Sequence, residues 1–400
     1  MNPLVQEIRA VVRLAVPVAL SQLGMMLMGF VDTAMVGRFS EIDAINERNI
    51  AAVGIGHAFC MGIVVPLQGI LFGLDPFISQ AAGISDLDRV RLWRQRGLLL
   101  AVLLSIPVLL VAAFAPGAFF RMWRQPEDVV PLAVDYVRAN LLGIVPVMLF
   151  TITRQASLAL SRVRPVLWAV AIANIGNFGA NWALVFGNLS LPALGAVGAG
   201  WATSLSRILL FVMIELSSRL GLREIYGQWT RRAFELRPLW SVLRIGLPTG
   251  FQIGLEYWVF AAVTLFMGYF GPTAQAGHQI ALVLASTTFM VPLGVSVSAT
   301  TRVGNAIGRG DQEAARRSSH VCLGLGALVM LVSATCFAVF PEPLSRLFSP
   351  SNERVVALAA TLLPVAAVFQ VFDGLQAVGA GVLRGTADTR VPATIALLGF

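Results

Sequence analysis

The sequence predicts an all-α polytopic membrane protein. Of its 400 residues, 57% are hydrophobic and 12% are charged, whereas charged residues make up about 25% of an average soluble domain. The mean hydropathy is +0.77. The apolar residues gather in segments close to the ~20 residues that a lipid-spanning helix needs. Composition, hydropathy and segment length therefore point to the same fold class.

The apolar segments follow one another along the whole chain. We expect helices over about 14–36, 50–74, 97–120, 132–157, 165–187, 193–217, 240–268, 275–301, 319–341 and 354–382, with a further one starting at 390. The first segment runs into Phe30, Val31 and Asp32 without a small-residue cleavage site. We interpret it as a transmembrane helix and not as a removable signal peptide.

The two halves of the chain repeat each other. Four sets of residues align: 14–17 (LAVP) with 245–248 (IGLP), 65–67 (VPL) with 291–293 (VPL), Pro146 with Pro364, and Pro165 with Pro392. Such parallel repeats are common in secondary transporters. We expect two pseudo-symmetric six-helix lobes, residues 1–235 and 236–400. On this register the chain ends within helix eleven, so about 50 residues of a twelve-helix plan are expected to be missing from the second lobe.

Basic residues predict the topology. All 29 of them are arginines, and they gather in the loops expected on one side of the membrane, which places the N-terminus in the cytoplasm. This loop pattern indicates membrane topology, and we expect no binding to nucleic acid. One arginine, Arg207, lies deep in an apolar segment, and the sequence identifies no partner for it.

The sequence motifs give little support for an enzyme. The absence of lysine excludes a P-loop lysine and a Schiff-base lysine. No HExxH or GxSxG motif is present, and the cysteines have no CxxC spacing. We therefore expect neither an enzyme nor a bound cofactor.

Three acids inside apolar segments are the best candidates for a functional site. An ionisable group in a lipid-spanning helix is costly and usually faces the bundle interior. Glu256 lies 12 residues from Arg244, and Asp373 lies 11 residues from Arg384. At ~1.5 Å per residue both acids are about 16–18 Å from the cytoplasmic end, so they share a depth. A pair of close acids binds a proton or a cation such as Na⁺. The third acid, Asp32, lies toward the outer end of the first segment.

Polar side chains elsewhere extend these candidate sites. Asn177 and Asn181 share one face of the fifth helix and can form a polar pocket with Asp32, or else act as interhelical hydrogen-bond donors. His278 and Gln279, early in the eighth helix, are compatible with lining the pocket of the second-half acids. A lone membrane histidine is equally compatible with packing.

Four segments resemble the multidrug and toxic-compound extrusion (MATE) family, in its NorM-like bacterial branch. They are 30–38 (FVDTAMVGR), 194–207 (LGAVGAGWATSLSR), 276–281 (AGHQIA) and 370–390 (QVFDGLQAVGAGVLRGTADTR). The resemblance covers nearly the whole chain. It implies a twelve-helix, two-lobed antiporter of the bacterial inner membrane that exports cationic and amphiphilic drugs in exchange for Na⁺ or H⁺. The paired asparagines of the family match Asn177 and Asn181.

The resemblance also assigns roles to the acids. The second-lobe cation site of the family falls on Glu256 and Asp373, where Na⁺ is a possible ligand, and its first-lobe acid falls on Asp32. One departure affects this assignment: many NorM-like members have a tyrosine one turn before the helix-ten aspartate, and this chain has Phe369. The missing hydroxyl weakens the case for Na⁺ coupling.

Together these observations predict a monomeric, cation-coupled drug antiporter that works by alternating access among membrane lipids. The alternative is a flippase for lipid-linked oligosaccharide or another lipid on a similar two-lobed scaffold. Such a flippase is expected to have basic residues for phosphate in its cavity. Here the midplane charges are mainly acidic apart from Arg207, which favours cationic cargo.

Overall fold

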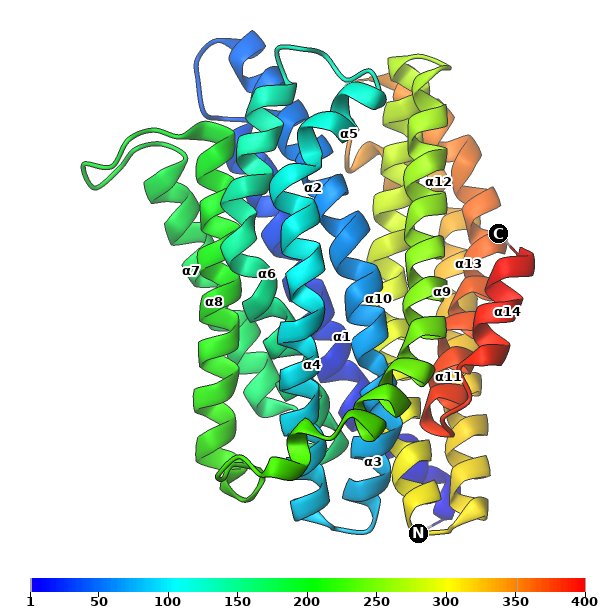
Figure 1. The fold of residues 1–400 in the computed structure, drawn as a ribbon. Coiled ribbons are helices and arrows are strands. Elements are labelled where there is room, and N and C mark those ends of the chain that lie inside the picture. Colours follow the sequence, from blue (N-terminus) through cyan, green and yellow to red (C-terminus); the bar gives the residue numbers. More distant parts are fainter. Residues whose placement is uncertain (1, 351, 400) are drawn as a thin grey trace. The chain divides into compact units, whose positions relative to one another are not determined.

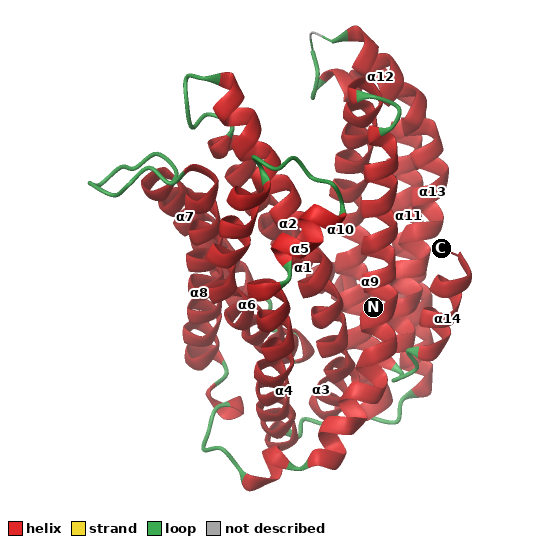
Figure 2. Cartoon of the chain, turned by 45° about the horizontal axis from the view of Figure 1, so that its top comes forward, coloured by secondary structure: helices red, strands yellow, loops and turns green. Residues whose placement is uncertain are grey.

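The computed structural model describes residues 2–350 and 352–399, and every regular element in this part of the chain is a helix (Figure 2). The α-helices are α1 (Pro3–Val36), α2 (Asp43–Leu71), α3 (Asp75–Gly83), α4 (Leu87–Phe114), α5 (Pro116–Met122), α6 (Val130–Ala159), α7 (Arg164–Leu184), α8 (Gly195–Gly221), α9 (Leu236–Gly268), α10 (Pro272–Gly308), α11 (Gln312–Val339), α12 (Pro341–Arg346), α13 (Glu353–Gly385) and α14 (Arg390–Gly399). Three short 3-10 turns are η1 (Phe72–Leu74), η2 (Arg223–Ile225) and η3 (Arg231–Phe234). Among the described residues, eight helical stretches are long and apolar enough to cross a membrane. The all-α polytopic prediction is therefore confirmed.

The helices form two compact units that do not follow the order of the chain. Unit 1 holds the described residues of Met1–Leu23, Asp75–Ser85 and Leu255–Phe400, and unit 2 holds Gly24–Leu74 and Asp86–Gly254. Helices α1 and α9 each contribute to both units. Aligning Pro17 with Pro248 places the two crossing points at equivalent positions of the repeat. The lobe boundary between residues 235 and 236 describes the sequence repeat and stays a prediction.

In unit 2, α8 packs against both α6 and α7, as their neighbouring ribbons show in Figure 1. Small residues at the start of α8 permit this. A Cβ atom at Gly198 would lie 2.5 Å from the carbonyl oxygen of Leu184 on α7. A Cβ atom at Gly200 would lie 2.8 Å from the carbonyl oxygen of Tyr136 on α6. The glycines thus fix α8 between its neighbours, and with it the polar residues that follow.

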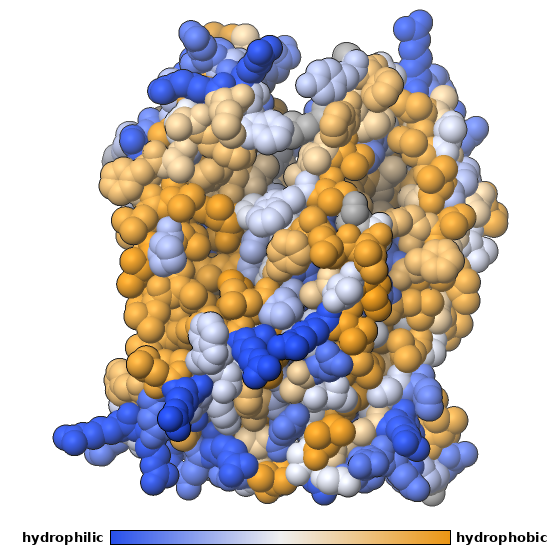
Figure 3. Space-filling model, turned by 45° about the vertical axis from the view of Figure 1, so that its right-hand side comes forward, coloured by the Kyte–Doolittle hydropathy of each residue, from blue (hydrophilic) through white to orange (hydrophobic). Residues whose placement is uncertain are grey.

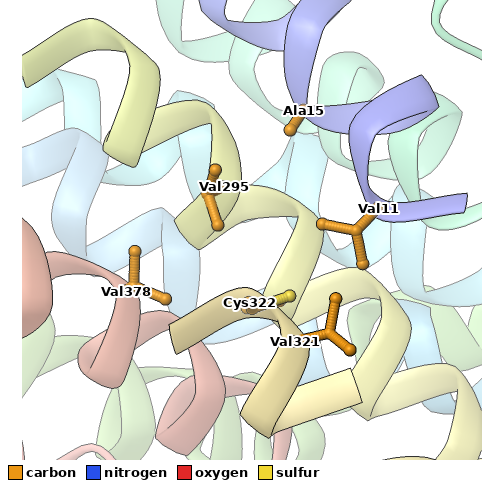
Figure 4. Close-up of a cluster of buried hydrophobic side chains, with 7 residues drawn as sticks. Val11, Ala15, Val295, Val321, Cys322 and Val378 are labelled. Carbon is orange, nitrogen blue, oxygen red and sulfur yellow. The ribbon is translucent and has the colours of Figure 1, made fainter. Parts of the chain in front are cut away.

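In unit 1, the N-terminal part of α1 packs on the helices of the second half. Figure 4 shows a buried apolar cluster in which α1 meets α10, α11 and α13, formed by Val11, Ala15, Val295, Ala299, Val321, Cys322 and Val378. One polar contact reinforces it. Glu7 accepts hydrogen bonds from Nε and Nη2 of Arg302 at 3.0 and 2.6 Å and from Oγ of Ser318 at 2.7 Å. The buried carboxylate therefore ties α1 to α10 and α11.

The outer faces of the helices are apolar. Most of the face drawn in Figure 3 is hydrophobic, and its hydrophilic side chains gather mainly toward the ends. On α8, Leu205, Val212 and Leu216 are each about half exposed and share one helix face by their spacing. That face is the one that lipid would cover.

Candidate functional site

The first polar cluster surrounds Asp32 in unit 2. The Asp32 carboxylate is 3% exposed. Its Oδ1 accepts hydrogen bonds from Nδ2 of Asn177 at 2.9 Å and Nδ2 of Asn181 at 2.6 Å, and its Oδ2 accepts one from Oγ1 of Thr203 at 2.6 Å. Helices α1, α7 and α8 thus each supply part of one site. The structure brings together the acid and both asparagines that the sequence singled out.

Thr203 is the member of this cluster that sequence reasoning missed. It lies in the segment 194–207 but is one of several hydroxyl residues there, so its type alone gives no signal. A signal exists in its position. Thr203 is one turn before Arg207, on the face of α8 opposite Leu205, and that face had to be buried. A hydroxyl on a buried helix face needs a hydrogen-bond partner, and the structure supplies the Asp32 carboxylate.

The asparagine amides keep free acceptors in this cluster. Within the part of the chain that the structure describes, Oδ1 of Asn177 and Oδ1 of Asn181 are buried and have no hydrogen-bond partner. Buried polar atoms are rarely left unsatisfied. These two oxygens, with the Asp32 carboxylate, can accept a proton donor or coordinate a small cation.

Arg207 also belongs to unit 2. Its guanidinium acts electrostatically on Asp32, His57, Cys60 and Tyr136, which lie on α1, α2 and α6. No ion pair or hydrogen bond joins Arg207 to another of the described residues. This partly buried positive charge therefore has neighbours but no direct partner among the described residues.

The second polar site is the acid pair of unit 1. Glu256 on α9 and Asp373 on α13 are partly buried, and their carboxyl groups are in hydrogen-bond contact. A hydrogen bond between two carboxyl groups requires a proton on one of them. Oδ1 of Asp373 is buried without a partner among the described residues. The two acids, which were expected at equal depth, are in contact in the fold.

An aromatic pair lies one helical turn from the acid pair. The rings of Phe260 and Phe369 meet nearly edge to face, with centroids 5.8 Å apart and an interplanar angle of 74°. Phe260 follows Glu256 by four residues, and Phe369 precedes Asp373 by four. Helices α9 and α13 therefore run antiparallel here, with the two phenylalanines at one side of the acids. Phe369 contributes an apolar wall there and no oxygen ligand.

Gln370 fixes α13 beside the acid pair. It is 2% exposed, its Oε1 accepts a hydrogen bond from Thr288 on α10 at 3.1 Å, and its Nε2 donates one to Ser333 on α11 at 3.2 Å. Asp373 lies three residues further along the same helix. The sequence did not single out Gln370, because a buried glutamine has no distinguishing pattern.

His278 and Gln279 lie on α10. Nε2 of His278 is buried and has no hydrogen-bond partner among the described residues, while Gln279 is exposed. No hydrogen bond or ion pair between described residues joins either of them to Glu256 or Asp373. Their place in a pocket with the acid pair stays a prediction.

The described residues contain no group of three or more His, Cys, Asp or Glu side chains that could hold a metal ion. The acid pair supplies carboxylate oxygens from two residues. Such a pair suits a proton directly, and it suits Na⁺ only if further oxygen ligands join it. A metal role for Glu256 and Asp373 stays a prediction.

The chain is similar to known transport proteins over nearly all of its length. A family described as MatE matches residues 17–183 and 248–400. A probable multidrug resistance protein NorM of Bradyrhizobium diazoefficiens is 35% identical, across 100% of this chain and 85% of the relative. The multidrug resistance protein NorM of Burkholderia vietnamiensis is 35% identical, across 97% of this chain and 83% of the relative. The crystal structure of the eukaryotic MATE transporter AtDTX14 has a TM-score of 0.87 at 20% identity, covering 99% of this chain and 87% of that one.

Proposed function

The chain belongs to the MatE family, and on that premise we propose that it is a multidrug efflux transporter. It exports cationic and amphiphilic compounds in exchange for Na⁺ or H⁺, by alternating access. The names of its NorM relatives support drugs as the cargo. The hydrogen-bonded acid pair of Glu256 and Asp373 supports coupling to a cation.

The acid pair supports coupling because it can hold one positive charge at a time. Two adjacent carboxyl groups in a low-dielectric setting bind a proton or a cation to relieve their repulsion. A drug cation competes for the same negative charge. Exchange then requires the ion and the drug to stabilise different conformations of the transporter. Shifting the ratio of two conformations from 1:99 to 99:1 takes ~5.5 kcal/mol of difference in binding free energy.

The Asp32 cluster supplies a second ion site in this proposal. Its carboxylate already accepts three hydrogen bonds, so it is held as an acceptor at a fixed place. Protonation of Asp32 would remove the negative charge that these donors stabilise. The cluster would then rearrange, which links ion binding to the packing of α1, α7 and α8.

The distribution of the arginines supports the proposed membrane setting. Their concentration in the loops of one side supports a bacterial inner-membrane protein with a cytoplasmic N-terminus. The transporter acts as a monomer surrounded by lipid. It transports its substrate chemically unchanged, so neither a catalytic residue nor a cofactor enters the proposal.

Charge-neutralising variants test the role of the acid pair. We expect Glu256→Gln and Asp373→Asn to lower ethidium export from intact cells to the level of cells without the transporter, at equal protein amounts in the membrane. The control is Glu353→Gln, which removes an exposed carboxylate at the start of α13. Parental export by both acid variants would refute the proposal.

A lipid flippase is the second candidate, and Arg207 is the observation that favours it, because a guanidinium binds phosphate well. In that case a deletion strain would accumulate lipid-linked intermediate and remain as resistant to ethidium as its parent. Export of ethidium by the purified protein supports the first candidate.

A further inference from the structure

Arg207 occupies an unusual place for an arginine in a lipid-spanning helix. It is 12 residues from the start of α8 at Gly195, about 18 Å along the helix axis and near its middle. By helical spacing it lies opposite Leu205 and Leu216, the apolar residues of the exposed face. Arg207 therefore faces the interior of unit 2 and not lipid.

The interior around Arg207 is polar but does not neutralise it. The stem of the side chain passes over α6, where a Cβ atom at Gly143 would lie 2.8 Å from its Cδ atom. Asp32 is within electrostatic reach, yet its two carboxylate oxygens are bonded to Thr203 and the two asparagines. The residue is partly exposed, so its side chain is not completely enclosed by the helices of unit 2.

An unpaired charge at mid-membrane depth is costly. Its usual partners are a carboxylate, a phosphate or water, and a guanidinium matches the first two with a planar, bidentate fork. No described residue fills that role for Arg207. A ligand with an anionic group would.

We propose that Arg207 is an anion subsite that binds the carboxylate of zwitterionic substrates. This inference rests on the proposed function, since it concerns the cargo of the same transporter. A purely cationic drug gains nothing from Arg207, whereas a cationic drug that also carries a carboxylate can pair that group with the guanidinium.

A matched pair of ligands tests the subsite. A fluoroquinolone with a basic amine carries both charges, and its ethyl ester keeps the amine but lacks the carboxylate. The readout is the Kd of each compound for the purified full chain in detergent, measured by its own fluorescence. Arg207→Gln is expected to raise the ratio of acid Kd to ester Kd about tenfold, the value of one charge-assisted contact.

Two further variants separate the effect of the Arg207 charge on binding from an effect on folding. Arg207→Lys keeps the positive charge without the fork, so its ratio is expected to lie between those of the parent and Arg207→Gln. Arg138→Gln, an exposed arginine paired with Asp135, is expected to match the parent. An unchanged ratio in Arg207→Gln, with the ester still bound, overturns the proposal.

Lipid phosphate is the other source of an anion at this place. In nanodiscs with increasing phosphatidylglycerol, the parental Kd for the acid is expected to stay constant. A Kd that rises with phosphatidylglycerol in the parent but not in Arg207→Gln would assign the subsite to lipid instead and overturn the proposal. Because binding is measured without transport, a failure to export either compound would count against the proposed function and not against the subsite.

Discussion

Thr203 donates a hydrogen bond of 2.6 Å to Oδ2 of Asp32, from a helix that lies far from Asp32 in the sequence. The two asparagines of α7 occupy the other carboxylate oxygen. The three donors come from two helices and converge on a carboxylate that is almost fully buried. This arrangement makes Asp32 the point at which α1, α7 and α8 are joined by polar contacts.

We expect Thr203→Val to destabilise the protein by about 1–3 kcal/mol, because it leaves one buried carboxylate oxygen without its donor. Ethidium export is expected to fall as well, since Asp32 loses part of its positioning. Thermal unfolding in detergent and export from cells measure the two effects. Thr203→Ser keeps the hydroxyl and serves as the control. Parental stability and export in Thr203→Val would show that this contact does not matter.

The ion pair between the buried Glu7 and the partly exposed Arg302 is expected to stabilise unit 1 (Figure 4 shows the neighbouring apolar cluster). Removing one partner of a fully buried pair typically costs about 3–5 kcal/mol, and the cost is smaller where one partner reaches solvent. Glu7→Gln should therefore lower the unfolding temperature clearly, and the double variant Glu7→Gln with Arg302→Gln should lose less than the sum of the single losses. Additive losses would mean that the two residues act independently.

The segment between α8 and α9 is held by α4. Nη2 of Arg96 donates to the carbonyl oxygen of Arg232 and to Glu235, both at 3.0 Å, and Gln95 donates to the carbonyl oxygen of Gln228 at 3.0 Å. We expect Arg96→Gln to release this segment, so that trypsin cleaves after Arg232 at least several times faster. Limited proteolysis of the purified protein measures this rate.

The control for that experiment is Arg138→Gln, which removes an exposed pair with Asp135. Exposed pairs are worth about 0–1 kcal/mol, so the rate of cleavage after Arg232 should match that of the parent. If Arg96→Gln is cut no faster than Arg138→Gln, the contacts of Arg96 do not hold the segment.

Phe369→Tyr tests the choice of coupling ion. In the parent, Phe260 and Phe369 place rings without oxygen ligands one turn from the acids, and we expect a pH gradient to drive export better than a Na⁺ gradient. The added hydroxyl can become a ligand for Na⁺, so Phe369→Tyr should increase the Na⁺-driven share of ethidium export. Proteoliposomes with imposed gradients measure both shares. A parent driven by Na⁺ alone would contradict this expectation.

The shared depth of the two acids and the shared face of the two asparagines were predictable because both follow from helical geometry. Counting residues from Arg244 and Arg384 gave Glu256 and Asp373 the same level, and a spacing of four put Asn177 and Asn181 on one face. Neither argument depends on knowing which helices touch. The depth of a residue along a helix and the helix face on which it lies are predictable from one chain.

Partners across helices were harder to predict. Glu215 and Arg219 have the spacing of a pair within one helix, yet Glu215 bonds to Arg94 of α4 and Thr153 of α6. Helix α1 passes from one unit into the other after Leu23, and α9 does so after Gly254. Neither of these changes of unit was predicted. A repeat aligns residue types but does not state which helices each segment packs against.

The two halves of the sequence repeat differ at the positions of the candidate site residues. Aligning Pro17 with Pro248 pairs Asp32 with Val263 and Glu256 with Met25. The two polar sites are therefore not copies of each other, although the helices that carry them are. This divergence agrees with separate roles for the Asp32 cluster and the acid pair.

Ion-driven efflux from proteoliposomes tests the central claim most directly. Vesicles containing the purified protein are loaded with ethidium, and a pH or Na⁺ gradient is imposed with the ion more concentrated outside. The account predicts faster ethidium efflux with one of these gradients than without, and loss of that acceleration in Glu256→Gln and Asp373→Asn. Equal efflux with and without both gradients, or full acceleration in both variants, would contradict it.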